Sequence, residues 1–242
     1  MNNTIKVNSK NTLMVAHRGV SGLEKENTCA AFVAAGNRSY FGVETDIHRT
    51  GDGNFIILHD ANTDRVSGDN INVEQTSFET LRRMQLNSRN EIKDRADLHL
   101  PSLEEYIGIC RQYEKVCVLE LKSDYTDDEI KRMIDRIDAM GYLSSVIFIA
   151  FNYENLKRVR AYKPEQPCQF LTMEMNDEGI ARLAADQIDL DIYYPALSKE
   201  LIDKLHANGT KINCWTVDKK EDAERLIGWG VDFITSNILE GC

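Results

Sequence analysis

The second half of the chain alternates regularly between apolar runs and stretches with helical periodicity. The apolar runs are Val116 to Leu121, Val146 to Phe151, Gln169 to Thr172, Ile192 to Tyr194, Lys211 to Val217 and Asp232 to Thr235. The helical stretches are Asp127 to Met140, Tyr153 to Ala161, Asn176 to Ala185, Ser198 to Asn208 and Lys219 to Trp229. Strands and helices that alternate at this spacing predict βα units around a parallel sheet.

Two earlier apolar runs, Leu13 to Ala16 and Gly42 to His48, raise the number of predicted parallel strands from six to eight. Eight βα units in 242 residues predict an α/β fold of the TIM (β/α)8 barrel type, whose active site lies at the carboxyl ends of the strands. Two small domains are a less favoured alternative at this length.

A hairpin follows the second predicted strand. The runs Val43 to His48 and Phe55 to Leu58 flank Gly51-Asp52-Gly53, which is a strong turn signal. A hairpin partner runs antiparallel, so Phe55 to Leu58 is expected to be an extra strand beside the barrel. A turn centred near Asp52 places His59 about level with Thr45.

Three carboxylates are expected at one mouth of this barrel. Glu44 and Asp46 are two residues apart and share one face of their strand, which on its own is also the pattern of a solvated face. Glu120 and Lys122 likewise share a face at a strand end and could form a simple ion pair. In a barrel, Glu44, Asp46 and Glu120 would converge into an all-oxygen set suited to Mg²⁺ or Ca²⁺ rather than zinc.

Basic side chains are expected around the same mouth. Arg18 and Lys122 are two cations suited to phosphate oxygens. His17 and His59 each directly follow an apolar run, and two imidazoles beside a metal are what acid–base cleavage of a phosphodiester needs. The histidines at 48, 99 and 206 are interpreted as hairpin, surface or packing residues. Trp215 is equally a core aromatic or a flat wall for a small polyol.

Shorter sequence patterns indicate the structure of the segments that connect the predicted strands. Cys29 to Gly36 is predicted to be helical, with Asn27 or Thr28 as N-cap and Gly36 as C-cap. The mostly polar stretch from Ala61 to about Leu100 contains a turn at residues 67–70 and one short helical pattern at 78–86. We interpret it as an insertion, without a core-forming strand, over one end of the main domain. A further helix is expected after Pro101, capped by Ser102.

Composition excludes several classes of partner. A net charge of −10 argues against nucleic acid and anionic membrane surfaces. The absence of an 18-residue apolar run and of a leader pattern argues against membrane insertion and secretion. Six cysteines without CxxC spacing are typical of reduced core thiols, which predicts a cytoplasmic protein. Glycine-rich nucleotide fingerprints do not follow the predicted strands. The sequence does not indicate the oligomeric state.

Taken together, these motifs resemble the glycerophosphodiester phosphodiesterase family. Its pattern of His-Arg, Glu-x-Asp and His-Asp is matched by His17-Arg18, Glu44-Thr45-Asp46 and His59-Asp60. The resemblance spans nearly the whole chain and includes the following further segments: Gly19, Glu26-Asn27-Thr28, Pro101 to Glu105, Glu120-Leu121-Lys122, Trp215-Thr216-Val217 and Gly230-Val231-Asp232. Two departures are Lys25 before the Glu-Asn-Thr triplet and Ser236-Asn237 near the last strand; both bear on substrate preference more than on the reaction.

The resemblance implies a single TIM-barrel domain over residues 1–242, with an insertion at about 61–100. It implies metal-dependent hydrolysis of small glycerophosphodiesters to glycerol 3-phosphate and an alcohol. Carried over by position, it assigns the metal to Glu44, Asp46 and Glu120, acid–base catalysis to His17 and His59, and phosphate binding to Arg18 and Lys122, with Glu26 in a supporting role and Trp215 beside the glycerol.

Several alternatives remain open at this point. Either histidine could be the base, and the attacking oxygen could come from water or from the glycerol 2-hydroxyl. The alcohol head group and the choice between Mg²⁺ and Ca²⁺ are also open. A phospholipase D-like hydrolase acting on lysophospholipids is the nearest rival within enzymes, although the polar insertion disfavours it. A non-catalytic barrel that binds a phosphorylated ligand is the alternative of a different class, although it would need no proton-transfer pair.

Overall fold

A closed barrel of parallel strands forms the centre of the molecule. The computed structural model describes residues 3–242, and within them eight strands follow one another around the barrel: β2 (Leu13–Ala16), β3 (Gly42–Arg49), β5 (Val116–Leu121), β6 (Val146–Ala150), β7 (Cys168–Thr172), β8 (Asp189–Tyr193), β9 (Ile212–Trp215) and β10 (Phe233–Ser236). The barrel closes because β2 pairs in parallel with both β10 and β3. The predicted TIM barrel is confirmed.

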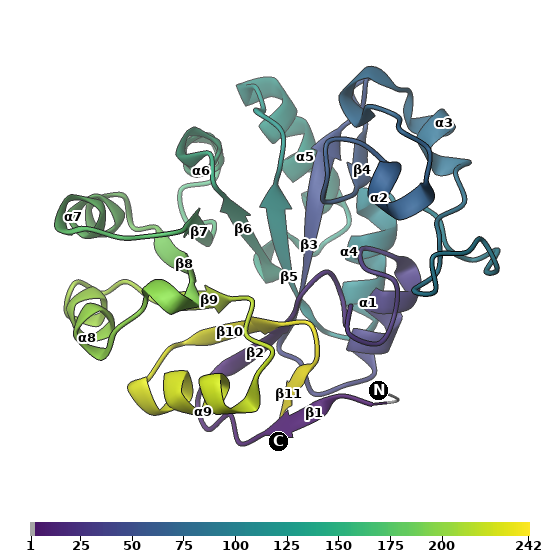
Figure 1. Cartoon of the computed structure of the whole chain (residues 1–242). Helices are drawn as coiled ribbons and strands as arrows, with labels where there is room; N and C mark the ends of the chain where they lie inside the picture. Colours follow the sequence, from purple (N-terminus) through teal and green to yellow (C-terminus); the bar gives the residue numbers. More distant parts are fainter. Residues whose placement is uncertain (1–2) are drawn as a thin grey trace.

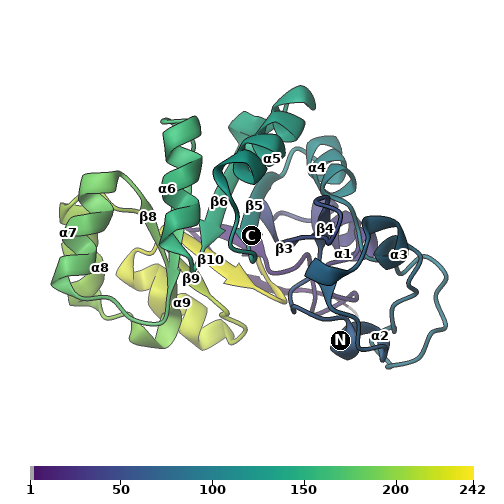
Figure 2. The same ribbon diagram turned by 90° about the horizontal axis from the view of Figure 1, so that it is seen from above.

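Helices follow the strands and cover the outside of the barrel (Figures 1 and 2). They are α1 (Cys29–Gly36), α4 (Leu103–Gln112), α5 (Asp127–Ala139), α6 (Tyr153–Tyr162), α7 (Asp177–Asp186), α8 (Lys199–Ala207) and α9 (Lys220–Trp229). The cap of α1 is Thr28, whose side chain accepts a hydrogen bond from the backbone of Ala31, and this frees Asn27 for another role. Ser102 caps α4 as predicted, in a capping box with Glu105.

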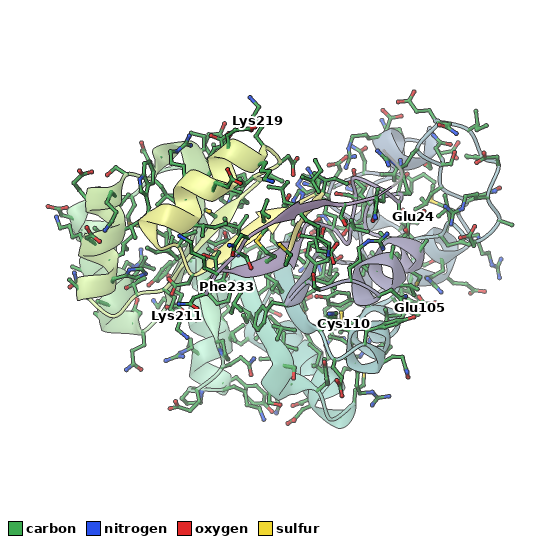
Figure 3. The ribbon with its side chains drawn as sticks, turned by 90° about the horizontal axis from the view of Figure 1, so that it is seen from below. Glu24, Glu105, Cys110, Lys211, Lys219 and Phe233 are labelled. Atoms are coloured by element: carbon green, nitrogen blue, oxygen red, sulfur yellow. The ribbon has the colours of Figure 1, made fainter. Side chains whose placement is uncertain are left out.

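Successive side chains of each barrel strand point alternately outward and inward, so the strands contribute to two separate apolar regions. Outward-facing side chains such as Leu190 and Ile192 belong to the large core between strands and helices. A smaller cluster fills the inside of the barrel, as layered side chains do in this fold, and includes Phe233 of β10 (Figure 3). Side chains closer to the carboxyl ends of the strands are therefore free to line a site rather than the core.

The predicted extra strand is β4 (Phe55–Ile57), which pairs antiparallel with the end of β3. It leads into residues 61–100, which carry α2 (Asp64–Ser67), the 3-10 turn η1 (Val73–Gln75) and α3 (Phe78–Arg82). In Figure 2, α2 and α3 lie on the opposite side of the barrel from α7 and α8. The helix starting at Phe78 is shorter than predicted.

The insertion has an apolar core of its own, which its polar composition did not indicate. That cluster also takes in side chains from β4 and from the approach to α4: Ile56, Leu58, Val66, Val73, Leu81, Leu86, Leu98 and Leu100. Its members are spaced irregularly along the chain, so periodicity cannot find them. The packing anchors the segment to β4 and thereby positions the residues that follow β4.

Other boundaries differ from the predictions by a few residues. β8 begins at Asp189 rather than Ile192, and β6 ends at Ala150, which leaves Phe151 outside the strand. Two short strands were not predicted, β1 (Ile5–Val7) and β11 (Leu239–Gly241), and they pair in parallel at the lower edge of Figure 1. Two further 3-10 turns are η2 (Leu143–Ser145) and η3 (Tyr194–Ala196). Among the helices of residues 3–242, none has the length and apolarity to cross a bilayer.

Candidate active site

A cavity of about 100 Å³ opens at the carboxyl ends of the barrel strands. Strand ends and the loops that follow them supply its lining: His17, Arg18, Glu44, His59, Glu120, Lys122, Ile149, Phe151, Leu171, Asp191, Trp215, Thr216 and Thr235. Most of the polar residues predicted from sequence therefore lie in one place. Asp46 lies just beneath the lining, where it contacts two of the lining cations.

The three predicted carboxylates converge. One oxygen each from Glu44, Asp46 and Glu120 lies within 4.8 Å of the others, and all three side chains are buried. The parallel register explains this, because Asp46 of β3 is level with Glu120 of β5 and Glu44 lies two residues earlier on β3. The cluster is an all-oxygen donor set for a hard divalent cation, and Oδ1 of Asp46 has no hydrogen-bond partner within residues 3–242.

Two cations lie against the carboxylates. Nζ of Lys122 is 2.8 Å from Oε1 of Glu120 and 3.6 Å from Oδ1 of Asp46. Nε of Arg18 is 3.4 Å from Oδ2 of Asp46, and its backbone N–H donates to Glu44 at 2.8 Å. That backbone contact uses a left-handed conformation at Arg18 (φ 51°), which turns the chain sharply after β2. Asn27 completes the group by donating to Oδ2 of Asp46 at 2.7 Å.

The carboxyl groups differ in proton affinity. Burial and the neighbouring Asp46 raise the pKa of Glu120 to about 8, and burial with the same neighbour raises the pKa of Glu44 well above its usual value. Burial also acts to raise the pKa of Asp46, but Arg18 and Lys122 outweigh it and hold that pKa below its usual range. A bound divalent cation would displace the protons from Glu44 and Glu120.

Each of the two site histidines is held through Nδ1. Nδ1 of His59 lies 2.6 Å from a carboxylate oxygen of Asp60, and Nδ1 of His17 lies 2.7 Å from Oδ1 of Asn237. The Asn237 amide is oriented by Asp218, which accepts from its Nδ2 at 2.6 Å. Both imidazoles therefore carry a proton on Nδ1 and keep Nε2 for the cavity.

Burial lowers the pKa of both imidazoles. For His17 burial and the nearby Arg18 bring the pKa to about 4. For His59 burial is again the largest effect, partly offset by Asp46. Both rings are consequently neutral at pH 7 in the protein alone, so Nε2 of each is a proton acceptor before an anion enters the cavity.

Three further residues considered in the sequence analysis lie as follows. Glu26 bonds to the Arg18 guanidinium at 2.9 Å, outside the cavity lining. Trp215 lines the cavity and contacts the rings of Phe151 and Tyr193, with centroids 5.8 and 5.7 Å apart. His48 lies on the hairpin as predicted, where it is buried on β3 opposite Ile56 of β4.

The other histidines lie away from the cavity. His99 bonds to backbone carbonyls of the insertion, and His206 bonds to Asp232. Their interpretation as packing and surface residues agrees with these contacts.

Comparison with known proteins identifies the family. The model of the Glycerophosphoryl diester phosphodiesterase family matches residues 17–240. The chain belongs to this family. A glycerophosphodiester phosphodiesterase of Caldanaerobacter subterraneus subsp. tengcongensis is 29% identical over 230 residues, covering 93% of this chain and 94% of that protein. As a family member, the chain is an enzyme of the phosphodiesterase class.

Solved structures agree with the barrel fold. A glycerophosphodiester phosphodiesterase from Parabacteroides distasonis superposes with a TM-score of 0.80 at 25% identity, covering 94% of this chain and 93% of that one. A phosphodiesterase from Oleispira antarctica, determined in complex with the product sn-glycerol-3-phosphate, gives a TM-score of 0.82 at 24% identity over 93% of this chain and 92% of that one. The second likeness shows the fold alone.

Four residues of the site were missed at the sequence level. Asn237 and Asp218 hold His17, Arg65 of α2 contacts both Asp60 and Glu26, and Asp191 lines the cavity from β8. Asn237 was noted only as a departure from the family pattern. Asp191 was overlooked because Asp189 and Asp191 break the apolar run that would have marked the start of β8.

Proposed function

We propose that this protein hydrolyses glycerophosphodiesters to glycerol 3-phosphate and an alcohol, using a divalent cation and His17 and His59. The observation that carries the proposal is the shared cavity. Two histidines, held through Nδ1 by Asn237 and Asp60, line it together with two cations and the carboxylate cluster. A barrel that only bound phosphate would need the cations but not the pair of imidazoles, which disfavours the non-catalytic alternative.

The charges of the site support a metal requirement. When ionised, Glu44, Asp46 and Glu120 contribute −3, and Arg18 and Lys122 contribute +2, which leaves −1. A phosphodiester also carries −1, so this fully ionised site would repel it. A divalent cation changes the balance to +1, which attracts the substrate.

We assign the cation, Mg²⁺ or Ca²⁺, to Glu44, Asp46 and Glu120, and when bound it supplies positive charge for the non-bridging phosphate oxygens. Arg18 and Lys122 bind the same phosphate group and stabilise the charge that grows on it, each worth about 3 kcal/mol by comparison with other preorganised donors. The ion pairs of Arg18 with Glu26 and of Lys122 with Glu120 hold both cations at the cavity before substrate binds.

The partners of the histidines favour one division of roles. Asp60 is a carboxylate and stabilises a positive imidazole, which suits His59 to be the acid that protonates the departing alkoxide. Asn237 is a neutral amide and suits His17 to be the base that takes a proton from the attacking oxygen. That oxygen is from water or from the glycerol 2-hydroxyl. Detection of a cyclic glycerophosphate during a single turnover would identify the second route.

The test is release of glycerol 3-phosphate from glycerophosphocholine by the metal-stripped protein, with and without added Mg²⁺ or Ca²⁺. Activity is expected only with metal, and His17→Ala and His59→Ala should each lower the rate about 10²–10⁴-fold. His206→Ala, which alters a histidine bonded to Asp232 outside the cavity, is the matched control and should retain full activity. Turnover that survives exhaustive chelation would refute the metal requirement.

One observation keeps lysophospholipids as a second candidate class of substrate. Phe151, Met173 and Tyr193 are large exposed apolar side chains at the carboxyl ends of the neighbouring strands β6, β7 and β8. They form an apolar rim on the side of the cavity away from the polar insertion, where a hydrocarbon chain could lie. Hydrolysis of lysophosphatidylcholine to lysophosphatidate and choline would establish this activity, and its absence would restrict the enzyme to deacylated substrates.

Two further expectations accompany the proposal. We propose that residues 1–242 act as one domain with an insertion at about 61–100. We also propose the cytoplasm as the compartment of the protein, which the six free cysteines support because four of them are buried in the core.

A further inference from the structure

Polar side chains inside the barrel are paired with one another. Nδ2 of Asn213 on β9 donates to Oε1 of Gln169 on β7 at 3.2 Å, and Oγ1 of Thr235 on β10 donates to Oδ1 of Asn213 at 3.1 Å. All three residues are at most 2% exposed. Their pairing is the ordinary condition of buried polar groups, because an unpaired one loses its hydrogen bonds to water without replacement.

Asp191 is the exception in this interior. It lies on β8, between the strands of Gln169 and Asn213, and its register partner on β9 is Asn213. The side chain is 2% exposed and lines the cavity, yet within residues 3–242 its Oδ1 has no hydrogen-bond partner. A buried carboxyl group without a partner destabilises the fold, so its presence at the cavity wall indicates a contact with something that the cavity holds.

A second unpaired group faces the same space. Nε1 of Trp215 is buried without an acceptor in the described part of the chain, and Trp215 lines the cavity from β9. Tyr193 is the register partner of Trp215, so Asp191 and Trp215 are two residues out of level on adjacent strands. The indole can only donate a hydrogen bond, whereas the carboxyl group of Asp191, whose pKa burial and Glu120 raise well above its usual value, has oxygens that accept one.

Such a pair is complementary to hydroxyl groups, which both donate and accept. In one direction around the closed barrel, β6 and β7 lie between β5 of the carboxylate cluster and β8, and they contribute the apolar side chains of Ile149 and Leu171 to the wall. A ligand with its phosphate between Arg18 and Lys122 would therefore present its carbon chain to these apolar side chains and its hydroxyls to the far wall.

We infer that Asp191 and Trp215 bind the hydroxyl groups of the polyol part of the substrate, so that Asp191 determines specificity for hydroxylated phosphates. The inference rests on the proposed function and adds a residue to it. Asp191 would accept a hydrogen bond from one hydroxyl while the Trp215 N–H donates to another. A phosphate ester without hydroxyls would leave both protein groups unpaired and would bind more weakly.

The test compares the binding of glycerol 3-phosphate and propyl phosphate, which differ only in the hydroxyls, by titration calorimetry with saturating Mg²⁺. The wild type should bind glycerol 3-phosphate about 10–100-fold more tightly, because propyl phosphate would leave the buried polar groups of Asp191 and Trp215 unpaired. Asp191→Leu should lose most of this preference, and Asp191→Asn, which keeps an acceptor oxygen, should keep part of it.

Asp189→Leu is the matched control. Asp189 lies two residues earlier on β8 and already accepts from the backbone N–H of Lys211 at 2.8 Å, so its substitution should lower the Tm but preserve the ligand preference. Asp191→Leu should leave the Tm unchanged or raise it, because it removes an unpaired buried group. These opposite changes in Tm separate a residue kept for binding from one kept for structure.

The outcomes against the inference are distinct. Equal binding of the two phosphates by the wild type, or an unchanged preference in Asp191→Leu, would overturn it. So would failure of both Asp191 variants to fold, which would make the residue structural. A wild type that shows the binding preference but cleaves no glycerophosphodiester would instead refute the proposed reaction while supporting the role of Asp191.

Discussion

Nε of Arg65 lies 2.7 Å from Oδ2 of Asp60, the carboxylate whose other oxygen holds Nδ1 of His59. The two terminal nitrogens of the same guanidinium each lie 2.8 Å from an oxygen of Glu26, which in turn bonds to Arg18. Arg65 thus contacts both Asp60, which holds the proposed acid His59, and Glu26, which holds Arg18. Arg18 is one of the two residues proposed to bind phosphate.

We expect Arg65→Ala to lower kcat about 10–100-fold, because small displacements of His59 and Arg18 are enough to misalign proton transfer and phosphate binding. Arg65→Lys should recover only part of the loss, since an ammonium group cannot reproduce the planar fork. The control is Arg83→Ala, which removes an exposed arginine paired with Glu79 on the same insertion. Steady-state kinetics with glycerophosphocholine would decide, and full activity of Arg65→Ala would show that the bridge does not position the site.

The Asn237 amide should determine the tautomer of His17. Asn237→Ala removes the acceptor of Nδ1 and allows the proton to move to Nε2, where it would block the proposed base. We expect kcat to fall about 10–100-fold with little change in KM. Asn208→Ala, at the C-cap of α8, is the comparison because its side chain bonds only to a local backbone carbonyl. An equal loss in both variants would point to general destabilisation.

Metal-free protein should lose stability as the pH rises, because of Glu120. Its pKa is raised from 4.5 to about 8 in the folded state, so the folded protein binds more protons than the unfolded chain between these values. Each step upward in pH across that window therefore favours unfolding, by on the order of 2–4 kcal/mol in total. The side chain introduced by Glu120→Gln has no proton to lose in this pH window, so the variant lacks this contribution to the pH dependence of stability.

Thermal melts in EDTA from about pH 4.5 to about 8 provide the measurement for Glu120. The Tm of Glu120→Gln minus that of the wild type should grow with pH across this window, and added Mg²⁺ or Ca²⁺ should raise the Tm of the wild type more than that of the variant. A Tm difference that is independent of pH, or an equal metal response in both proteins, would contradict the assignment.

The opposite pH dependence is expected for Glu240 of β11. It accepts from the backbone and side chain of Ser39 at 2.7 and 2.8 Å and pairs with Lys6 of β1 at 2.7 Å. Burial acts to raise its pKa, but hydrogen bonds from Lys6, Thr4 and Ser39 outweigh it and lower the pKa from 4.5 to about 2. Its contribution to stability is therefore complete above about pH 4.5 and is lost as the pH falls towards 2.

Glu240→Gln should cost about 1–2 kcal/mol of unfolding free energy at pH 7, measured by urea denaturation, and the cost should shrink as the pH falls below 4.5. Lys6→Met removes only the half-exposed partner and should cost less than about 1 kcal/mol. A cost for Glu240→Gln that persists unchanged at low pH would show that the charge of this carboxylate does not hold the two terminal strands.

Sequence reasoning located the parts of the site whose placement follows from strand periodicity. Glu44, Asp46 and Glu120 could be brought together on paper because two-residue alternation and parallel register determine where their side chains point. The barrel followed from the same regularity. Arg65 and Asn237 could not be found in this way, because their partners depend on how loops fold over the strand ends.

Asp191, inside the barrel, was missed for a different reason. A strand is recognised by its apolar residues, but β8 carries aspartates at 189 and 191 on its inward face and keeps only Leu190 and Ile192 as apolar signals. A polar residue facing a cavity breaks the pattern that would have revealed the strand. On a strand as short as β8, an inward-facing functional residue therefore hides the strand that carries it.

The pairing of β4 with only the last residues of β3 has a consequence for how this site can change. β3 completes its contacts with β2 and β5 before the chain turns back, so β4 and everything it carries are appended to a barrel wall that is already closed. His59, Asp60 and Arg65 belong to the appended piece, whereas the carboxylate cluster belongs to the wall. Evolution could accordingly remodel the proton donor and its surroundings while inheriting the cation site intact.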